Sequence, residues 1–172
     1  ENKYKTSNSL DKRFVFFNSG YNLRPTDITA SIGLNQLKRI KFFIKNRTYN
    51  RNSIINTFKN NKILSKNVNF YHENKNVFAS WFGLPIRINK ILKKNKNKII
   101  DALENKGVET RPIISGNFTK QPAAKKYKLG VNQKFPNTDR VYNSSFFIGL
   151  PTQRISTIKL KKLEKVFEIA FS

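Results

Sequence analysis

Apolar residues recur at steps of three to five along residues 28–58, and basic residues fall mostly between them. This spacing places the apolar side chains on one face of an amphipathic helix and leaves the basic ones in solvent. Pro25 ends any earlier helix, and Thr26 or Asp27 is a good N-cap. The pattern therefore predicts one long helix, straight or bent, over residues 26–60. Helices of this length commonly join two domains.

Shorter apolar segments alternate with polar ones after residue 60. The segments favour strands at 68–71 (VNFY), 77–88 (VFASWFGLPIRI), 108–114 (VETRPII) and 145–150 (SFFIGL), a helix within 97–107 that ends at Gly107, and a last helix after Ser156 or Thr157. A long polar loop with a short helical turn lies between the strands at 108–114 and 145–150. The order predicts a small α+β domain attached to a connecting helix.

The first residues show no start signal for a helix or strand. Residues 1–12 are polar, and the following RFVFF run (13–17) is short enough to be a strand or a buried loop. The sequence begins with Glu and contains no Met. We therefore expect it to be the later portion of a longer protein.

Composition narrows the class of protein. The 172 residues are 38% hydrophobic with 15 Phe, enough to bury a core, and no apolar run approaches the roughly 18 residues of a membrane helix. We expect a soluble, cytoplasmic chain without membrane partners. The absence of Cys excludes disulfides and thiolate metal ligands, and a lone His72 does not make a metal site.

The net charge of +24 is compatible with a polyanionic partner. Much of the excess, however, is Lys accompanied by Asn, Ile and Phe, which an AT-rich coding sequence also produces. No RNP, GXXG or zinc-finger pattern accompanies it. A basic nucleic-acid-binding module is therefore kept as an alternative that we do not favour. A smaller anion, such as a nucleotide diphosphate, would also be attracted by this charge.

The segment GYNLRPTD (20–27) combines features of a phosphate site. Gly20 permits a tight turn, and the helix start that follows offers unpaired N–H groups at the positive end of its dipole. Asn22 adds an amide donor and Arg24 a guanidinium fork. The alternative is a helix-entry turn with a solvated arginine.

A second group of polar residues follows the expected strand at 108–114. Arg111 leads into the loop SGNFTKQP (115–122), which contains Asn117, and a polar loop after a strand is a common binding site. A surface loop with a salt-bridged Arg111 remains the alternative. Trp81, the single tryptophan, fits the core better than a ligand platform. No P-loop, G-x-G-x-x-G, catalytic triad or close carboxylate pair is present, so the chain holds no complete active site of its own.

Several motifs in order resemble those of the DegT–StrS type of sugar-nucleotide aminotransferases and dehydratases. They are GYNLRPTDITASIGLNQLKRIKFFIKNR, SWFGLPI, KGVETRPIISGNFTKQP and FPNTDRVYNSSFFIGLP, and the similarity covers nearly all of residues 14–170. The resemblance implies a pyridoxal 5′-phosphate or pyridoxamine 5′-phosphate enzyme of the aspartate-aminotransferase fold. Residues 1–25 would then end the large cofactor-binding α/β domain, 26–60 form the connecting helix, and 61–172 form a small β-α-β-β-α domain.

The same resemblance implies roles for particular residues. Asn22 and Arg24 would bind the phosphate of the partner subunit's cofactor in a homodimer, and Arg111 and Asn117 would face a nucleotide-sugar substrate. The last three motifs resemble the 4-keto-6-deoxy-sugar 3-dehydratase branch most closely, and TRPIISGN stands where the family's aminotransferases carry a His-containing segment. The family's catalytic Lys or His precedes GYNLR, so no catalytic residue is expected in this chain. We expect an inactive C-terminal part of a 3-dehydratase, or alternatively of an aminotransferase, for cell-surface polysaccharide such as lipopolysaccharide O-antigen.

Overall fold

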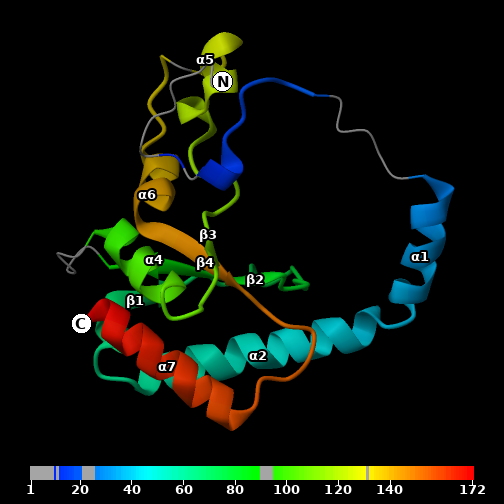
Figure 1. Cartoon of the computed structure of the whole chain (residues 1–172), viewed down its shortest axis with the longest axis vertical. Coiled ribbons are helices and arrows are strands. Elements are labelled where there is room, and N and C mark those ends of the chain that lie inside the picture. Colours follow the sequence, from blue (N-terminus) through cyan, green and yellow to red (C-terminus); the bar gives the residue numbers. More distant parts are fainter. Residues whose placement is uncertain (1–9, 11, 21–25, 90–94, 131) are drawn as a thin grey trace.

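A computed structural model describes residues 10, 12–20, 26–89, 95–130 and 132–172. Within them, four antiparallel strands form one sheet in the order β1-β2-β4-β3 (Figure 1). Asn22 and Arg24 lie outside the described residues. The strands are β1 (Val68–Phe70), β2 (Gly83–Ile88), β3 (Thr110–Arg111) and β4 (Ser145–Gly149).

The remaining elements of the described residues are helices. They are α1 (Asp27–Leu37), α2 (Ile40–Asn60), α3 (Leu64–Asn67), α4 (Lys96–Glu104), α5 (Pro122–Lys126), α6 (Pro136–Ser144) and α7 (Thr157–Phe171), with 3₁₀ turns η1 (Lys12–Phe14) and η2 (Phe118–Lys120). The fold is therefore mixed α/β, as the sequence predicted.

The single long helix expected over residues 26–60 is two helices. Arg39 N–H donates to the carbonyl of Gln36 at 2.9 Å, an i→i−3 bond that tightens the last turn and ends α1. α2 then starts at Ile40. α1 buries none of its residues and stands apart from the remainder of the fold in Figure 1, whereas α2 packs on the core. Hydrophobic spacing continues across the break, so spacing alone could not reveal it.

Two expected strands are shorter than their apolar segments. Of residues 77–88 only 83–88 pair, with Leu84, Ile86 and Ile88 buried in alternation. The expected strand at 108–114 shrinks to Thr110–Arg111, because Pro112 lacks an N–H group and Ile114 adopts a positive φ of 52°. The RFVFF run forms a 3₁₀ turn and a loop rather than a strand.

The core lies between the sheet and helices α2, α3, α4 and α7. Phe58 of α2 and Phe167 of α7 are both fully buried, with ring centroids 4.7 Å apart. Phe146 of β4 is also fully buried. Each such side chain contributes about 1.5–3 kcal/mol of burial free energy. Together with Phe171, these phenylalanines supply the largest side chains of the core in the described residues, whereas others, such as Phe78 and Phe82, are exposed.

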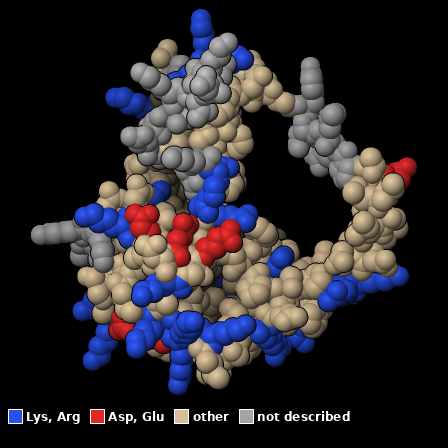
Figure 2. Space-filling model, in the orientation of Figure 1, with Lys and Arg blue, Asp and Glu red and all other residues tan. Residues whose placement is uncertain are grey.

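Lysine and arginine are spread widely over the surface. Figure 2 shows them over most of the visible face, including the lower edge formed by α2 and α7, while Asp and Glu gather mainly where α4 and β3 lie. The excess positive charge is therefore not confined to one stripe on this face.

Candidate functional site

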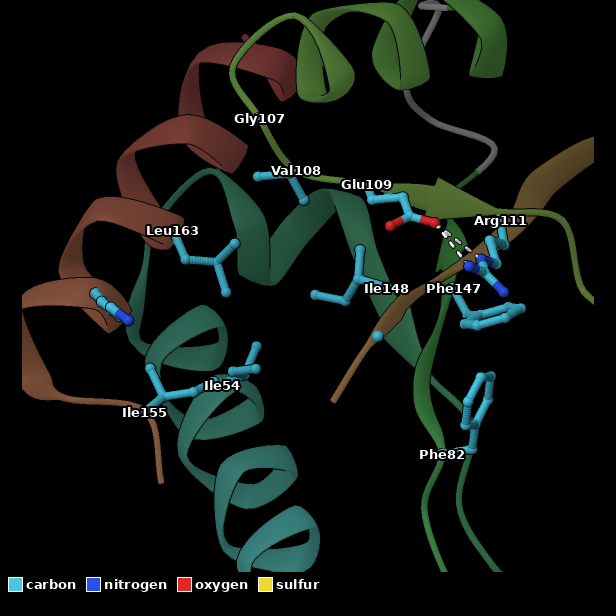
Figure 3. Close-up of a pocket in the computed structure, with 12 residues that line it drawn as sticks. Ile54, Phe82, Gly107, Val108, Glu109, Arg111, Phe147, Ile148, Ile155 and Leu163 are labelled. Atoms are coloured by element: carbon cyan, nitrogen blue, oxygen red, sulfur yellow. Dashed lines mark hydrogen bonds and ion pairs between the residues drawn. The ribbon is translucent and has the colours of Figure 1, made fainter. Parts of the chain in front are cut away.

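Arg111 lies at the mouth of a cavity of about 400 Å³ between the sheet and helices α2 and α7. Figure 3 shows apolar side chains from three elements around its interior, Ile54 of α2, Ile148 of β4 and Leu163 of α7. The complete lining is Ile54, Phe82, Gly107, Val108, Glu109, Arg111, Phe147, Ile148, Gly149, Ile155, Lys159 and Leu163. The cavity is thus apolar inside and charged at its rim.

Arg111 of the edge strand β3 forms an ion pair with Glu109, which directly precedes that strand (Figure 3). Its Nε and Nη2 both donate to one carboxylate oxygen, at 3.0 and 2.9 Å. Both side chains are substantially exposed, so the pair contributes at most about 1 kcal/mol. The bonds to Glu109 use two of five guanidinium N–H groups, and an anionic ligand could bind others. Arg111 is salt-bridged, as the structural alternative expected, but this does not exclude a binding role.

Asn117 is buried and organises the loop after β3. Its Nδ2 donates to Asp139 Oδ1 at 2.8 Å, and its Oδ1 accepts from both the backbone N–H and the hydroxyl of Thr119, at 3.0 and 2.7 Å. Asn117 therefore caps η2 and ties the loop to α6. A contact between Asn117 and substrate remains a prediction, whereas its hydrogen bonds within the protein are seen in the structure.

The loop between Arg111 and Asn117 contains backbone that ordinary residues avoid. Ile114 has a φ of 52° although it is β-branched, and its side chain is 80% exposed. Gly116 has a φ of 65°, and a Cβ built there would lie 2.3 Å from the ring of Tyr142. Strained backbone of this kind is often found in ligand-binding loops.

Asp139 connects this loop to a nearby lysine. The hydrogen bond from Asn117, followed by that from Lys120, holds the pKa of Asp139 below its usual value. Lys120 Nζ lies 3.0 Å from the carboxylate and 4.4 Å from the ring centroid of Tyr142. These contacts hold the loop after β3 against α6, and their role is structural rather than that of a catalytic acid or base.

Trp81 packs against the core, in agreement with the preferred interpretation of its role. The guanidinium of Arg51 lies 4.1 Å from its ring centroid, and Arg51 Nη2 donates to the carbonyl of Tyr71 at 3.0 Å. Burial lowers the pKa of Arg51, while the charge of Glu73 raises it. The sequence did not identify Arg51 as a buried cation.

α1 begins directly after the segment that contains the predicted phosphate turn, of which residues 21–25 lie outside the described residues. Asp27 is its first residue, and Thr26 has extended backbone at the N-cap, as expected. The Thr26 side chain caps no N–H group of α1, and its backbone carbonyl accepts from the Thr29 hydroxyl at 2.6 Å. The first amides of α1 therefore lack this internal partner, while Asp27 places a carboxylate in the same turn.

The described part of the chain offers little for metal or membrane binding. Its His, Asp and Glu residues nowhere form a group of three that could hold a metal ion. Over the same residues, no helix has both the length and the apolar character needed to span a bilayer.

Comparison with known proteins identifies the protein family to which the chain belongs. Over residues 2–168 the chain matches the DegT/DnrJ/EryC1/StrS aminotransferase family, and it belongs to that family. It is 29% identical to a GDP-4-keto-6-deoxy-D-mannose 3-dehydratase of Escherichia coli over 84% of this chain, and 28% identical to the lipopolysaccharide biosynthesis protein RfbH of Salmonella typhimurium over 94%. The alignments span only 36% and 37% of those relatives.

Solved structures agree on the fold. A GDP-4-keto-6-deoxymannose-3-dehydratase (ColD) mutant with bound GDP-perosamine superposes with a TM-score of 0.68 at 25% identity, covering 91% of this chain and 40% of that one. The E. coli GDP-4-keto-6-deoxy-D-mannose-3-dehydratase with bound hydrated PLP gives 0.67 at 24% identity, covering 95% and 40%. The chain thus has the fold of part of such an enzyme.

Proposed function

We propose that this chain is the C-terminal part of a pyridoxal- or pyridoxamine-phosphate-dependent enzyme that removes the C-3 hydroxyl of nucleotide-linked 4-keto-6-deoxy sugars. The observation that carries the proposal is the family match, together with the similarity of the chain to several nucleotide-sugar 3-dehydratases. The segment TRPIISGN, with Arg111 and Asn117, also lacks the histidines of the aminotransferase pattern. Transamination of a similar sugar is the alternative activity.

The cofactor, when bound, supplies an electron sink for bond breaking at the sugar. This chain's part is to hold the cofactor's phosphate through Asn22 and Arg24, in trans to the partner subunit's site in a homodimer. An amide and a guanidinium are suitable donors for that group. The catalytic Lys or His would lie outside this sequence.

Arg111 and Asn117 would serve the substrate. An exposed arginine at the rim of the cavity can bind the diphosphate of a nucleotide sugar, exchanging its weak pair with Glu109 for a stronger one. Asn117, whose polar atoms are already bonded, would act by holding the loop that follows Arg111. We place the enzyme in the cytoplasm, in synthesis of a cell-surface polysaccharide.

The test uses the full-length protein with pyridoxamine phosphate and GDP-4-keto-6-deoxymannose. The proposal expects a 3-deoxy sugar nucleotide, identified by mass spectrometry and NMR. An amino sugar formed with glutamate as donor would support the alternative. Neither product with GDP-, CDP- or dTDP-linked substrates would contradict the enzymatic proposal.

The alternative nucleic-acid module rests on the net charge of +24. It expects tight binding whose affinity falls by orders of magnitude as salt rises. The enzymatic proposal expects only weak, sequence-independent binding.

A further inference from the structure

A second cavity, here called the α6 cavity, lies between the end of strand β2 and helix α6. Its volume is about 910 Å³, within the range of ligand-binding cavities in proteins. Among the described residues, none lines both this cavity and the cavity of Arg111. Figure 1 shows α6 above the sheet, with α2 and α7 below it. The polar lining includes Arg87 of β2 and, from α6, Asn137, Asp139, Arg140 and Asn143.

The alternation of strand β2 brings Arg87 to the α6 cavity. Its neighbours Ile86 and Ile88 are buried in the core, so the side chain of Arg87 lies on the opposite face of the sheet. Three polar side chains of the lining recur at three-residue steps along one face of α6, those of Asn137, Arg140 and Asn143. The strand and the helix thus present polar groups to the same space.

Arg87 contributes a positive charge that lacks a partner. Its side chain is half-buried, and among the described residues its guanidinium forms no ion pair and no hydrogen bond. Burial removes water from this charge without replacing the lost hydrogen bonds, which is unfavourable. An anion in the cavity would supply the missing acceptors and offset that cost.

Arg140 places a second guanidinium in the lining. Its Nη2 donates to Asn137 Oδ1 at 3.0 Å, which uses one of its five N–H groups. Within the part of the chain that the structure describes, Arg140 forms no ion pair, and the side-chain amide of Asn143 makes no hydrogen bond. The cavity therefore offers more N–H donors than the protein supplies acceptors for them.

The carboxylate in the lining, that of Asp139, does not compensate these two charges. Its Oδ1 lies 3.0 Å from Lys120 Nζ and accepts from Asn117 Nδ2 at 2.8 Å. Lys120 and Asn117 both come from the segment after β3, and neither lines the α6 cavity. Asp139 is thus paired from outside, and Arg87 and Arg140 give the cavity a positive balance.

We propose that the α6 cavity binds the diphosphate group of a small molecule, with Arg87 and Arg140 as its principal ligands. A planar guanidinium can donate two parallel N–H bonds to phosphate oxygens. Two arginines match the charge of a diphosphate, and the volume leaves room for an organic group beside it. Inorganic pyrophosphate and a nucleoside diphosphate share this chemistry. The proposal does not rest on the proposed function and adds a second site to it.

The test measures amide exchange of residues 136–144 in the full-length protein with pyrophosphate, ADP or adenosine. A ligand that binds only the closed site slows exchange about tenfold at ten times its dissociation constant. We expect pyrophosphate and ADP to slow exchange in α6, and adenosine to have no effect. Tighter binding of ADP would support a nucleotide-like ligand, and equal binding would support recognition of the diphosphate alone. No slowing with either phosphate, or equal slowing with adenosine, would overturn the proposal.

Variants assign the effect to the two arginines. Arg87→Gln and Arg140→Gln should each raise the dissociation constant of pyrophosphate about tenfold or more. Arg87→Lys keeps the charge but not the planar fork, so its affinity should fall between those of Arg87→Gln and wild type. Arg39→Gln is the matched control and should leave the affinity unchanged, because Arg39 is exposed at the start of α2 and does not line the cavity.

Arg140 is exposed, so Arg140→Gln tests the site even if Arg87→Gln does not fold. Unchanged pyrophosphate affinity in Arg140→Gln would overturn the assignment. Amide exchange is measured without turnover, so it separates this site from the proposed function. A full-length protein that forms no 3-deoxy sugar nucleotide would defeat the proposed function and leave the α6 cavity to be judged by exchange alone.

Discussion

Asn117 donates a hydrogen bond of 2.8 Å to Asp139, which joins the loop after β3 to helix α6. This bond is the largest reason that the pKa of Asp139 lies below its ordinary value of 3.8, followed by the bond from Lys120. Since the folded pKa is the lower one, the contribution of Asp139 to stability is present above pH 3.8 and is lost as pH falls through the folded pKa.

Asn117→Ala should therefore raise the pKa of Asp139 toward its ordinary value. Carboxyl chemical shifts followed by NMR during an acid titration measure this directly. Asn137→Ala is the matched control, because Asn137 bonds to Arg140 and not to Asp139. If Asp139 titrates identically in Asn117→Ala and in wild type, the hydrogen bond from Asn117 does not lower the pKa of Asp139.

Gly116→Ala should destabilise the protein by about 1–3 kcal/mol, because the positive φ strains any side chain there and Tyr142 occupies the space of a Cβ. Urea unfolding followed by circular dichroism measures the change. In Gly149→Ala, where nothing lies within 4 Å of the added Cβ, stability should stay nearly constant. Equal effects of the two substitutions would argue against the close contact at Gly116.

Asn50→Ala should cost about 1–3 kcal/mol of unfolding free energy. Asn50 is fully buried on α2; its Nδ2 donates to the carbonyls of Pro151 and Gln153, and its Oδ1 accepts from the N–H of Ile155. Removing the side chain leaves all three backbone groups without this partner. Asn56→Ala, at an exposed position of the same helix, should be close to neutral in the same denaturation experiment. A neutral Asn50→Ala would show that water replaces these bonds.

Local sequence patterns correctly predicted those features of a helix or strand that depend only on its own residues and their neighbours in the sequence. Ser156 caps α7 by accepting from Lys159 N–H, and β4 covers all but the last residue of the strand expected at 145–150. Gly107, expected at the end of a helix, lies just after α4 with a φ of 80°. These features depend on neighbouring residues, which a sequence displays directly.

The polar contacts within the fold could not be predicted in the same way. Asn50 belongs to an Asn-rich background that composition alone explains, yet it fixes a loop 101–105 residues later. Gln121 was grouped with polar loop residues that could bind a ligand, whereas it is buried against the N-terminal segment. Arg51 likewise packs on Trp81 instead of facing solvent. Each partner comes from the tertiary fold, which no local pattern encodes.

The central claim is that Asn22 and Arg24 hold a cofactor phosphate, and pyridoxal phosphate affinity of the full-length protein tests it most directly. The measurement compares wild type with the double variant Asn22→Ala, Arg24→Ala and with the control Asn35→Ala, Lys38→Ala, an exposed amide and cation on or beside α1. We expect the first pair to raise the dissociation constant by about tenfold to a hundredfold, and the control pair to leave it unchanged. Equal affinity in all three proteins would contradict the account.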